Sequence, residues 1–96
     1  MWKRFSISLV LTAALALAAC VSAPVQQMSD ARQAITAAEV AGADDFAPQL
    51  MQESRELLER AEREISEERF AAARYHAVEA RQRALKALAA EPDPGE

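Results

Sequence analysis

The sequence predicts an all-α protein, a short alanine-rich helical hairpin or three-helix bundle that follows an N-terminal targeting segment. Apolar residues recur at three- and four-residue steps across residues 29–90, the spacing of one helical face. Alanine is abundant, and only three aromatic residues, Phe46, Phe70 and Tyr75, follow the single cysteine. With 96 residues the chain has room for one small domain, whose alanine-rich core needs close packing or a partner.

Residues 1–19 have the organisation of a signal peptide. Lys3 and Arg4 form a basic start, and residues 5–19 form an apolar run interrupted only by serine and threonine. A helix of about 15 residues spans roughly 22 Å, which is short of the roughly 30 Å hydrocarbon core of a bilayer. We therefore expect a cleavable targeting segment rather than a permanent transmembrane helix.

Leu17, Ala18, Ala19 and Cys20 resemble the lipobox of bacterial lipoproteins, in which an aliphatic and two small residues precede a cysteine. The first three are the expected recognition residues for signal peptidase, because small side chains let the protease approach the backbone. The Cys20 sulfur is the expected acceptor of a diacylglyceryl group, and cleavage frees an amine for a third acyl chain. At about 0.8 kcal/mol per buried methylene, two or three chains give durable anchoring. The alternative is an ordinary secretory signal that happens to contain a cysteine.

The residue after the cysteine bears on the destination. By resemblance to bacterial sorting rules, aspartate at this position favours retention in the inner membrane, whereas here it is Val21. We therefore expect the chain at the periplasmic face of the outer membrane. Residues 20–28 form the expected lipidated tether, which is short enough to keep the folded part close to the membrane surface.

The first helix is expected to begin after an N-cap at Ser29 or Asp30. Its apolar face consists of Met28, Ala31, Ile35 and Ala38. Gly42 suits the left-handed conformation that ends a helix.

The second helix is expected to be capped by Asp44 and Asp45, with Pro48 in its first turn. Its apolar stripe consists of Ala47, Leu50, Ser54, Leu57 and Ala61, with Ile65 near the end. The stripe of the third consists of Phe70, Ala73, Ala77, Ala80, Ala84 and Ala87. Residues 91–96 contain two prolines and a glycine, so we expect a disordered, solvated tail.

A turn at residues 66–69 is expected to separate the last two helices. The nine residues from Ala61 to Phe70, at about 100° each, would place the two stripes half a turn apart in one continuous helix. Residues 49–68 contain seven acids and three bases, and residues 69–90 contain five bases and one acid. Antiparallel packing brings these opposite charges together. One continuous helix is the alternative, because this segment has no glycine or proline.

The sequence contains no catalytic or metal-binding pattern, so we expect no enzyme activity. Nothing in it indicates a small-molecule substrate. His76 is the only histidine, so a surface position is favoured over a metal ligand. Glu67 and Glu68 are adjacent and are expected on a solvated face. Without Lys3 and Arg4, nine bases remain against 15 acids, a net charge of about −6 that argues against nucleic acid. No cofactor is expected apart from the covalent lipid on Cys20.

Two sets of side chains on the helices bear on partners. The pairs Glu56–Arg60, Glu59–Arg63 and Glu79–Arg83 have the spacing that supports a helix. A candidate partner face comprises Tyr75, Val78, Arg81, Arg83 and Leu85. Tyr75, Val78 and Leu85 would either cover the first helix or form an apolar strip available to another protein.

Across residues 29–90 the sequence resembles the envelope family catalogued as domain of unknown function 4398. The resemblance is carried by Ala34, Ile35, Ala38, Gly42, Ala43, Phe46, Ala47, Pro48, Leu57, Ala61, Phe70, Ala73, Ala77, Ala80 and Ala84. It implies a small, alanine-rich helical protein, often a lipoprotein, with no established activity. Members often have glycine followed by Asp or Asn before the last helix, where this chain has Glu68 and Arg69.

Together these features lead us to expect a membrane-anchored periplasmic lipoprotein with a structural or adaptor role in the cell envelope. Its expected partners are the membrane, through the lipid, and an envelope protein or a second copy of the chain. The alternative is a helical binding module with a chaperone-like or peptidoglycan-proximal role.

Overall fold

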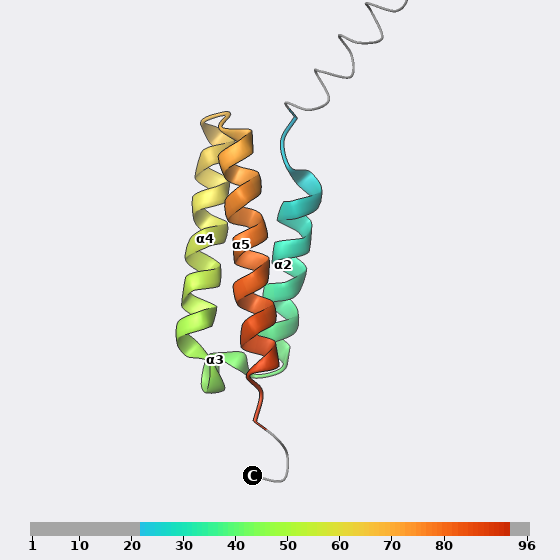
Figure 1. The fold of residues 1–96 in the computed structure, drawn as a ribbon, viewed down its shortest axis with the longest axis vertical. Coiled ribbons are helices and arrows are strands. Elements are labelled where there is room, and N and C mark those ends of the chain that lie inside the picture. Colours follow the sequence, from blue (N-terminus) through green and yellow to red (C-terminus); the bar gives the residue numbers. More distant parts are fainter. Residues whose placement is uncertain (1–21, 93–96) are drawn as a thin grey trace, which may run out of the picture.

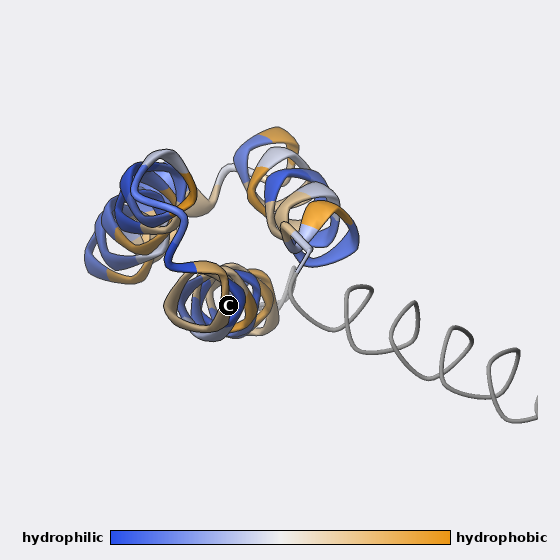
Figure 2. Ribbon diagram, turned by 90° about the horizontal axis from the view of Figure 1, so that it is seen from above, coloured by the Kyte–Doolittle hydropathy of each residue, from blue (hydrophilic) through white to orange (hydrophobic). Residues whose placement is uncertain are grey.

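A computed structural model describes residues 22–92 and shows three long helices packed side by side (Figure 1). The elements are α2 (Val25–Val40), the single turn α3 (Ala43–Phe46), α4 (Pro48–Ser66) and α5 (Phe70–Ala89). Helix α4 runs antiparallel to α2 and α5, and the three helices stand at the corners of a triangle when viewed along their axes (Figure 2). The predicted all-α fold is confirmed as a three-helix bundle. The predictions for Leu17, Ala18, Ala19 and Cys20 lie outside the described residues.

Helix α2 begins at Val25, earlier than expected, so the predicted N-cap at Ser29 or Asp30 is wrong. Pro24 takes the N-cap position, is fully buried, and its carbonyl oxygen accepts a hydrogen bond from the Met28 N–H at 3.0 Å. Proline suits a helix start because it lacks the N–H that would be unpaired there. Residues 25–28 of the expected tether therefore belong to the folded domain.

The connection from α2 to α4 uses the predicted glycine but not the predicted caps. Gly42 has φ of 87° and ends α2 in the left-handed conformation, as expected. Asp44 and Asp45 lie inside the turn α3, and neither α3 nor α4 has a side-chain cap hydrogen bond. Ala47 is the N-cap of α4, and Pro48 occupies its first turn as predicted. Asp44 does not cap α4 because its carboxylate binds Arg55 instead.

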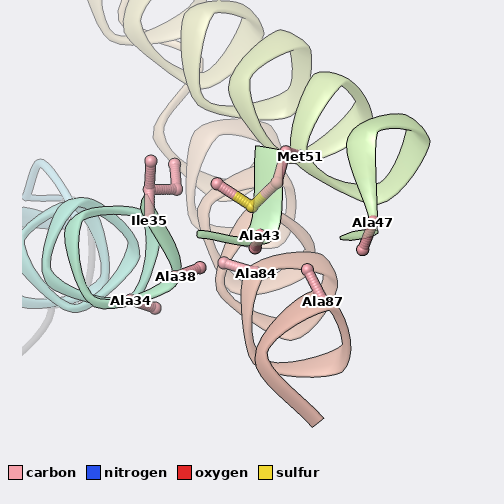
Figure 3. Close-up of a cluster of buried hydrophobic side chains, with 8 residues drawn as sticks. All are labelled: Ala34, Ile35, Ala38, Ala43, Ala47, Met51, Ala84 and Ala87. Atoms are coloured by element: carbon pink, nitrogen blue, oxygen red, sulfur yellow. The ribbon is translucent and has the colours of Figure 1, made fainter. Parts of the chain in front are cut away.

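The core is built from alanine stripes that allow close helix packing. The buried α5 residues are Ala73, Ala77, Ala80, Ala84 and Ala87, as predicted, whereas Phe70 of the predicted stripe is only half-buried. The predicted α2 face, Met28, Ala31, Ile35 and Ala38, is buried as well. Met51 lies outside the predicted α4 stripe, yet it is 0% exposed and reaches from α4 into the space between α2 and α5 (Figure 3). A flexible methionine fills the irregular space that small alanines leave.

The turn between α4 and α5 is confirmed. Helix α4 ends at Ser66, and Glu68 adopts a left-handed conformation with φ of 59°. The Arg69 N–H donates to the Glu64 carbonyl at 2.8 Å, and the Glu68 N–H donates to the Ile65 carbonyl at 3.0 Å. These two bonds form a Schellman motif, which usually contains glycine where this chain has Glu68.

Candidate functional site

The end of the bundle where the described chain begins is also the end that carries the α4–α5 turn (Figure 1). Met28, in the first turn of α2, packs in one buried cluster with Ala61, Ala73 and Ala77. Half-buried Leu58 and Ile65 extend this cluster. The segment that links Cys20 to α2 therefore joins the domain at the same end as this turn. Among the described residues, no helix combines the length and apolar character needed to span a bilayer.

Tyr75, Val78 and Leu85 form an exposed strip along α5, which we call the α5 strip. Their exposed fractions are 62%, 38% and 40%. At about 100° per residue they fall within an arc of about 80°, nearly opposite the buried alanine stripe. The alternative that these side chains cover the first helix is therefore wrong, and the strip faces away from the core.

The two arginines predicted for the same face are separated by the structure. Arg81 is exposed and borders the α5 strip about 40° beyond Leu85. Arg83 instead turns toward α4, where its Nε lies 3.4 Å from Glu53 and its Nη1 lies 3.4 Å from Glu79. Arg83 thus connects the two helices, and the exposed face has a different set of bases.

Three exposed bases flank the α5 strip. Arg74 and Arg81 lie on one side of it and Lys86 lies on the other. None of the three forms an ion pair with a residue that the structure describes. The outer face of α5 therefore carries Tyr75, Val78 and Leu85 along its centre, with Gln82 among them, and exposed bases on both sides, where Glu79 lies beside Lys86.

A shallow groove of about 540 Å³ lies on α4 beside Arg83 of α5. It is lined by Glu53, Glu56, Leu57, Glu59, Arg60, Arg63 and Arg83. Leu57, predicted for the core stripe, is only half-buried. Of the three pairs predicted at four-residue spacing, the described residues form Glu79–Arg83. The groove has mixed charge and no buried polar group directed into it, so it has fewer features of a binding site than the α5 face.

Buried Glu64 and half-buried His76 form a pair that the sequence did not indicate. Their side chains are 5% and 14% exposed, and His76 Nδ1 lies 2.5 Å from Glu64 Oε1. The expectation of a surface histidine is wrong, because the α4–α5 hairpin brings these residues together. One hydrogen bond therefore joins the imidazole of α5 to the carboxyl group of α4. The His76 ring also meets the Tyr75 ring edge-on at 5.2 Å, which links the α5 strip to the core.

Arg55 ties the opposite end of the bundle together. Its guanidinium donates two hydrogen bonds to Asp44, at 2.8 and 2.9 Å, and one to Glu39 at 3.2 Å. Hydrogen bonding to Arg55, with its positive charge, holds the pKa of Asp44 below the usual 3.8. The same hydrogen bonds, first to Asp44 and then to Glu39, raise the pKa of Arg55. This network joins α2, α3 and α4 and has a structural role.

Residues 22–92 contain no cluster of three or more histidine, cysteine, aspartate or glutamate side chains arranged to hold a metal ion. In comparisons with known proteins, the family model described as "Domain of unknown function (DUF4398)" matches residues 26–91. Neither the curated proteins nor the solved structures include a match to the chain.

Proposed function

The chain belongs to the DUF4398 family of domains of unknown function, and we propose that it is a lipoprotein with a structural or adaptor role in the cell envelope. In this proposal Cys20 carries the lipid, and the protein resides at the periplasmic face of the outer membrane. The observation that carries the proposal is the sequence Leu17-Ala18-Ala19-Cys20 at the end of a basic and apolar leader.

The position of the folded domain supports an anchor that holds it close to a membrane. Helix α2 begins at Val25, so the five steps of chain from Cys20 span at most about 18 Å. This distance exceeds the diameter of one helix, about 10–12 Å, by only a few ångströms. A lipid on Cys20 would therefore keep the turn end of the bundle at the bilayer surface.

The exposed α5 strip is free to contact a surface outside the bundle. Three exposed side chains, Tyr75, Val78 and Leu85, lie along one line of α5 rather than scattered over the surface. The same strip suits the alternative, a chaperone-like binding module, because such modules bind apolar segments. The two are separated by whether purified protein binds unfolded outer-membrane proteins, which the chaperone-like role requires.

The test of the anchor is the variant Cys20→Ser expressed in a bacterium that processes lipoproteins. We expect loss of incorporation of a labelled fatty acid, and accumulation of precursor or of a product that no longer sediments with membranes. Cys20→Ser with Gln26→Cys is the matched control, because it restores a thiol outside the lipobox and should remain unlabelled. A Cys20→Ser protein that is cleaved and membrane-bound like the parent would refute the proposal.

A further inference from the structure

We propose that the outer face of α5 docks on the anionic headgroups of the bilayer leaflet that holds the Cys20 lipid, so that the bundle lies on its side. The docking surface is the α5 strip together with Arg74, Arg81 and Lys86. This inference rests on the proposed lipid anchor, and it assigns the exposed strip a partner that the anchor alone does not.

The chemistry of the face matches a membrane surface. Tyrosine combines an apolar ring with a polar hydroxyl group. This combination suits the membrane interface, where the ring contacts acyl chains and the hydroxyl contacts headgroups. Val78 and Leu85 continue the apolar line, and the flanking bases have no carboxylate partner in the described part of the chain. Bases beside an apolar strip are the arrangement by which helices bind anionic lipid.

The charged residues of the bundle are distributed unevenly, with bases on α5 and most acids on the other helices. Helix α5 alone occupies one corner of the triangle, and the acid-rich α4 occupies another (Figure 2). The ion pairs Arg32–Glu62 and Arg55–Glu39 join α2 to α4, away from the outer face of α5. A bundle that rests on α5 therefore presents bases to the lipid and directs most of its acids away from it.

The size of the strip favours a membrane over a protein partner. Three side chains that are 62%, 38% and 40% exposed contribute far less than the roughly 800 Å² per partner of a standard protein interface. An anchored domain needs much less, because the anchor already keeps the face at high effective concentration near the bilayer. The chain from Cys20 to Val25, at most about 18 Å, is long enough for the bundle to lie down.

The test uses the full-length chain, purified from a bacterium that processes lipoproteins and mixed with vesicles, and a tryptophan reporter. The variant Tyr75→Trp places the reporter on the α5 strip, and Gln52→Trp is the matched control on an exposed position of α4. Each protein is reconstituted into vesicles of equal parts phosphatidylglycerol and phosphatidylcholine, with a fraction of the lipid brominated near the headgroup. We expect strong quenching of Tyr75→Trp and weak quenching of Gln52→Trp. In pure phosphatidylcholine, quenching of Tyr75→Trp should fall toward that of the control.

Removal of the bases tests the electrostatic part. At about 1 kcal/mol per base near an anionic surface, each of Arg74→Ser, Arg81→Ser and Lys86→Ser should lower the ratio of docked to undocked protein about fivefold. These side chains are exposed and unpaired, so circular dichroism should show unchanged helix content. Added salt should mimic the substitutions.

The outcomes separate the two levels of the proposal. Protein that does not float with vesicles refutes the anchor, and the docking with it. Protein that floats, but quenches equally at both reporter positions or independently of phosphatidylglycerol, refutes the docking alone. Shielding of Tyr75→Trp from acrylamide without quenching by lipid would assign the α5 face to another protein molecule, and would also overturn the inference.

Discussion

The pair formed by Glu64 and His76 makes the sharpest prediction for stability. The variant His76→Ala removes the hydrogen bond and leaves a carboxyl group that is only 5% exposed without its partner. Leaving one buried polar group without its hydrogen-bond partner costs about 1–3 kcal/mol, because the group is then neither solvated nor paired. A domain of about 70 residues has roughly 4–10 kcal/mol of total stability, so this variant should lose a clearly measurable part of it.

The prediction is specific because removing both partners should cost little. In Glu64→Leu with His76→Phe, no buried polar group is left unpaired, and the loss should be about 1 kcal/mol or less. The assay is urea unfolding of residues 22–96, in which far-ultraviolet circular dichroism measures the loss of helix. Arg74→Ala, an exposed neighbour without an ion pair, is the control and should lie within about 0.5 kcal/mol of the parent. A loss below about 1 kcal/mol in His76→Ala, or a double variant as unstable as the single one, would refute the reasoning.

Three further predictions concern single contacts measured by the same unfolding assay. Ser54→Ala removes a hydrogen bond of 2.6 Å to the Ala80 carbonyl and should cost about 1 kcal/mol; an unchanged midpoint would count against that contact. Because Arg55 lowers the pKa of Asp44, this group stabilises the fold fully above its unfolded value near 3.8. This contribution to the free energy of unfolding disappears as the pH falls through the lower folded pKa. Asp44→Asn should therefore lose less stability than the parent on acidification; an identical loss in both proteins would contradict the prediction. Glu68→Gly should stabilise the domain by about 1 kcal/mol, since glycine relieves a φ of 59°; destabilisation would show that the turn needs the glutamate.

Much of the fold followed from periodicity. The five buried alanines of α5 were recognisable because each follows the last by three or four residues. The turn at residues 66–69 was recognisable from the phase difference between Ala61 and Phe70. Glu68 shows why glycine is not required there, since two backbone hydrogen bonds hold the left-handed conformation.

The rest depended on how three helices meet. The buried face of α4 is wider than the predicted stripe, because it also includes Met51 and Glu64. Glu64 follows Ala61 by three residues, a spacing that points into the core, but its charge argued against burial. Only its pairing with His76, twelve residues away across the turn, makes that burial possible.

The candidate surface was partly predictable for the same reason. Helical phase placed Tyr75, Val78 and Leu85 together, but only the position of α2 decided that they remain exposed. Arg83 belonged to the predicted face by proximity in sequence, whereas its contact with Glu53 across the helix pair turns it away. Charges on side chains this long depend on neighbours that a single helix does not reveal.

The central proposal is that Cys20 anchors this bundle to a membrane. Intact mass spectrometry of the protein extracted from bacterial membranes tests it most directly. The proposal predicts a chain that begins at Cys20 and carries a diacylglyceryl group, with or without a third acyl chain on the amine. A membrane-associated chain that still begins at Met1, or a mature chain with an unmodified Cys20, would contradict it.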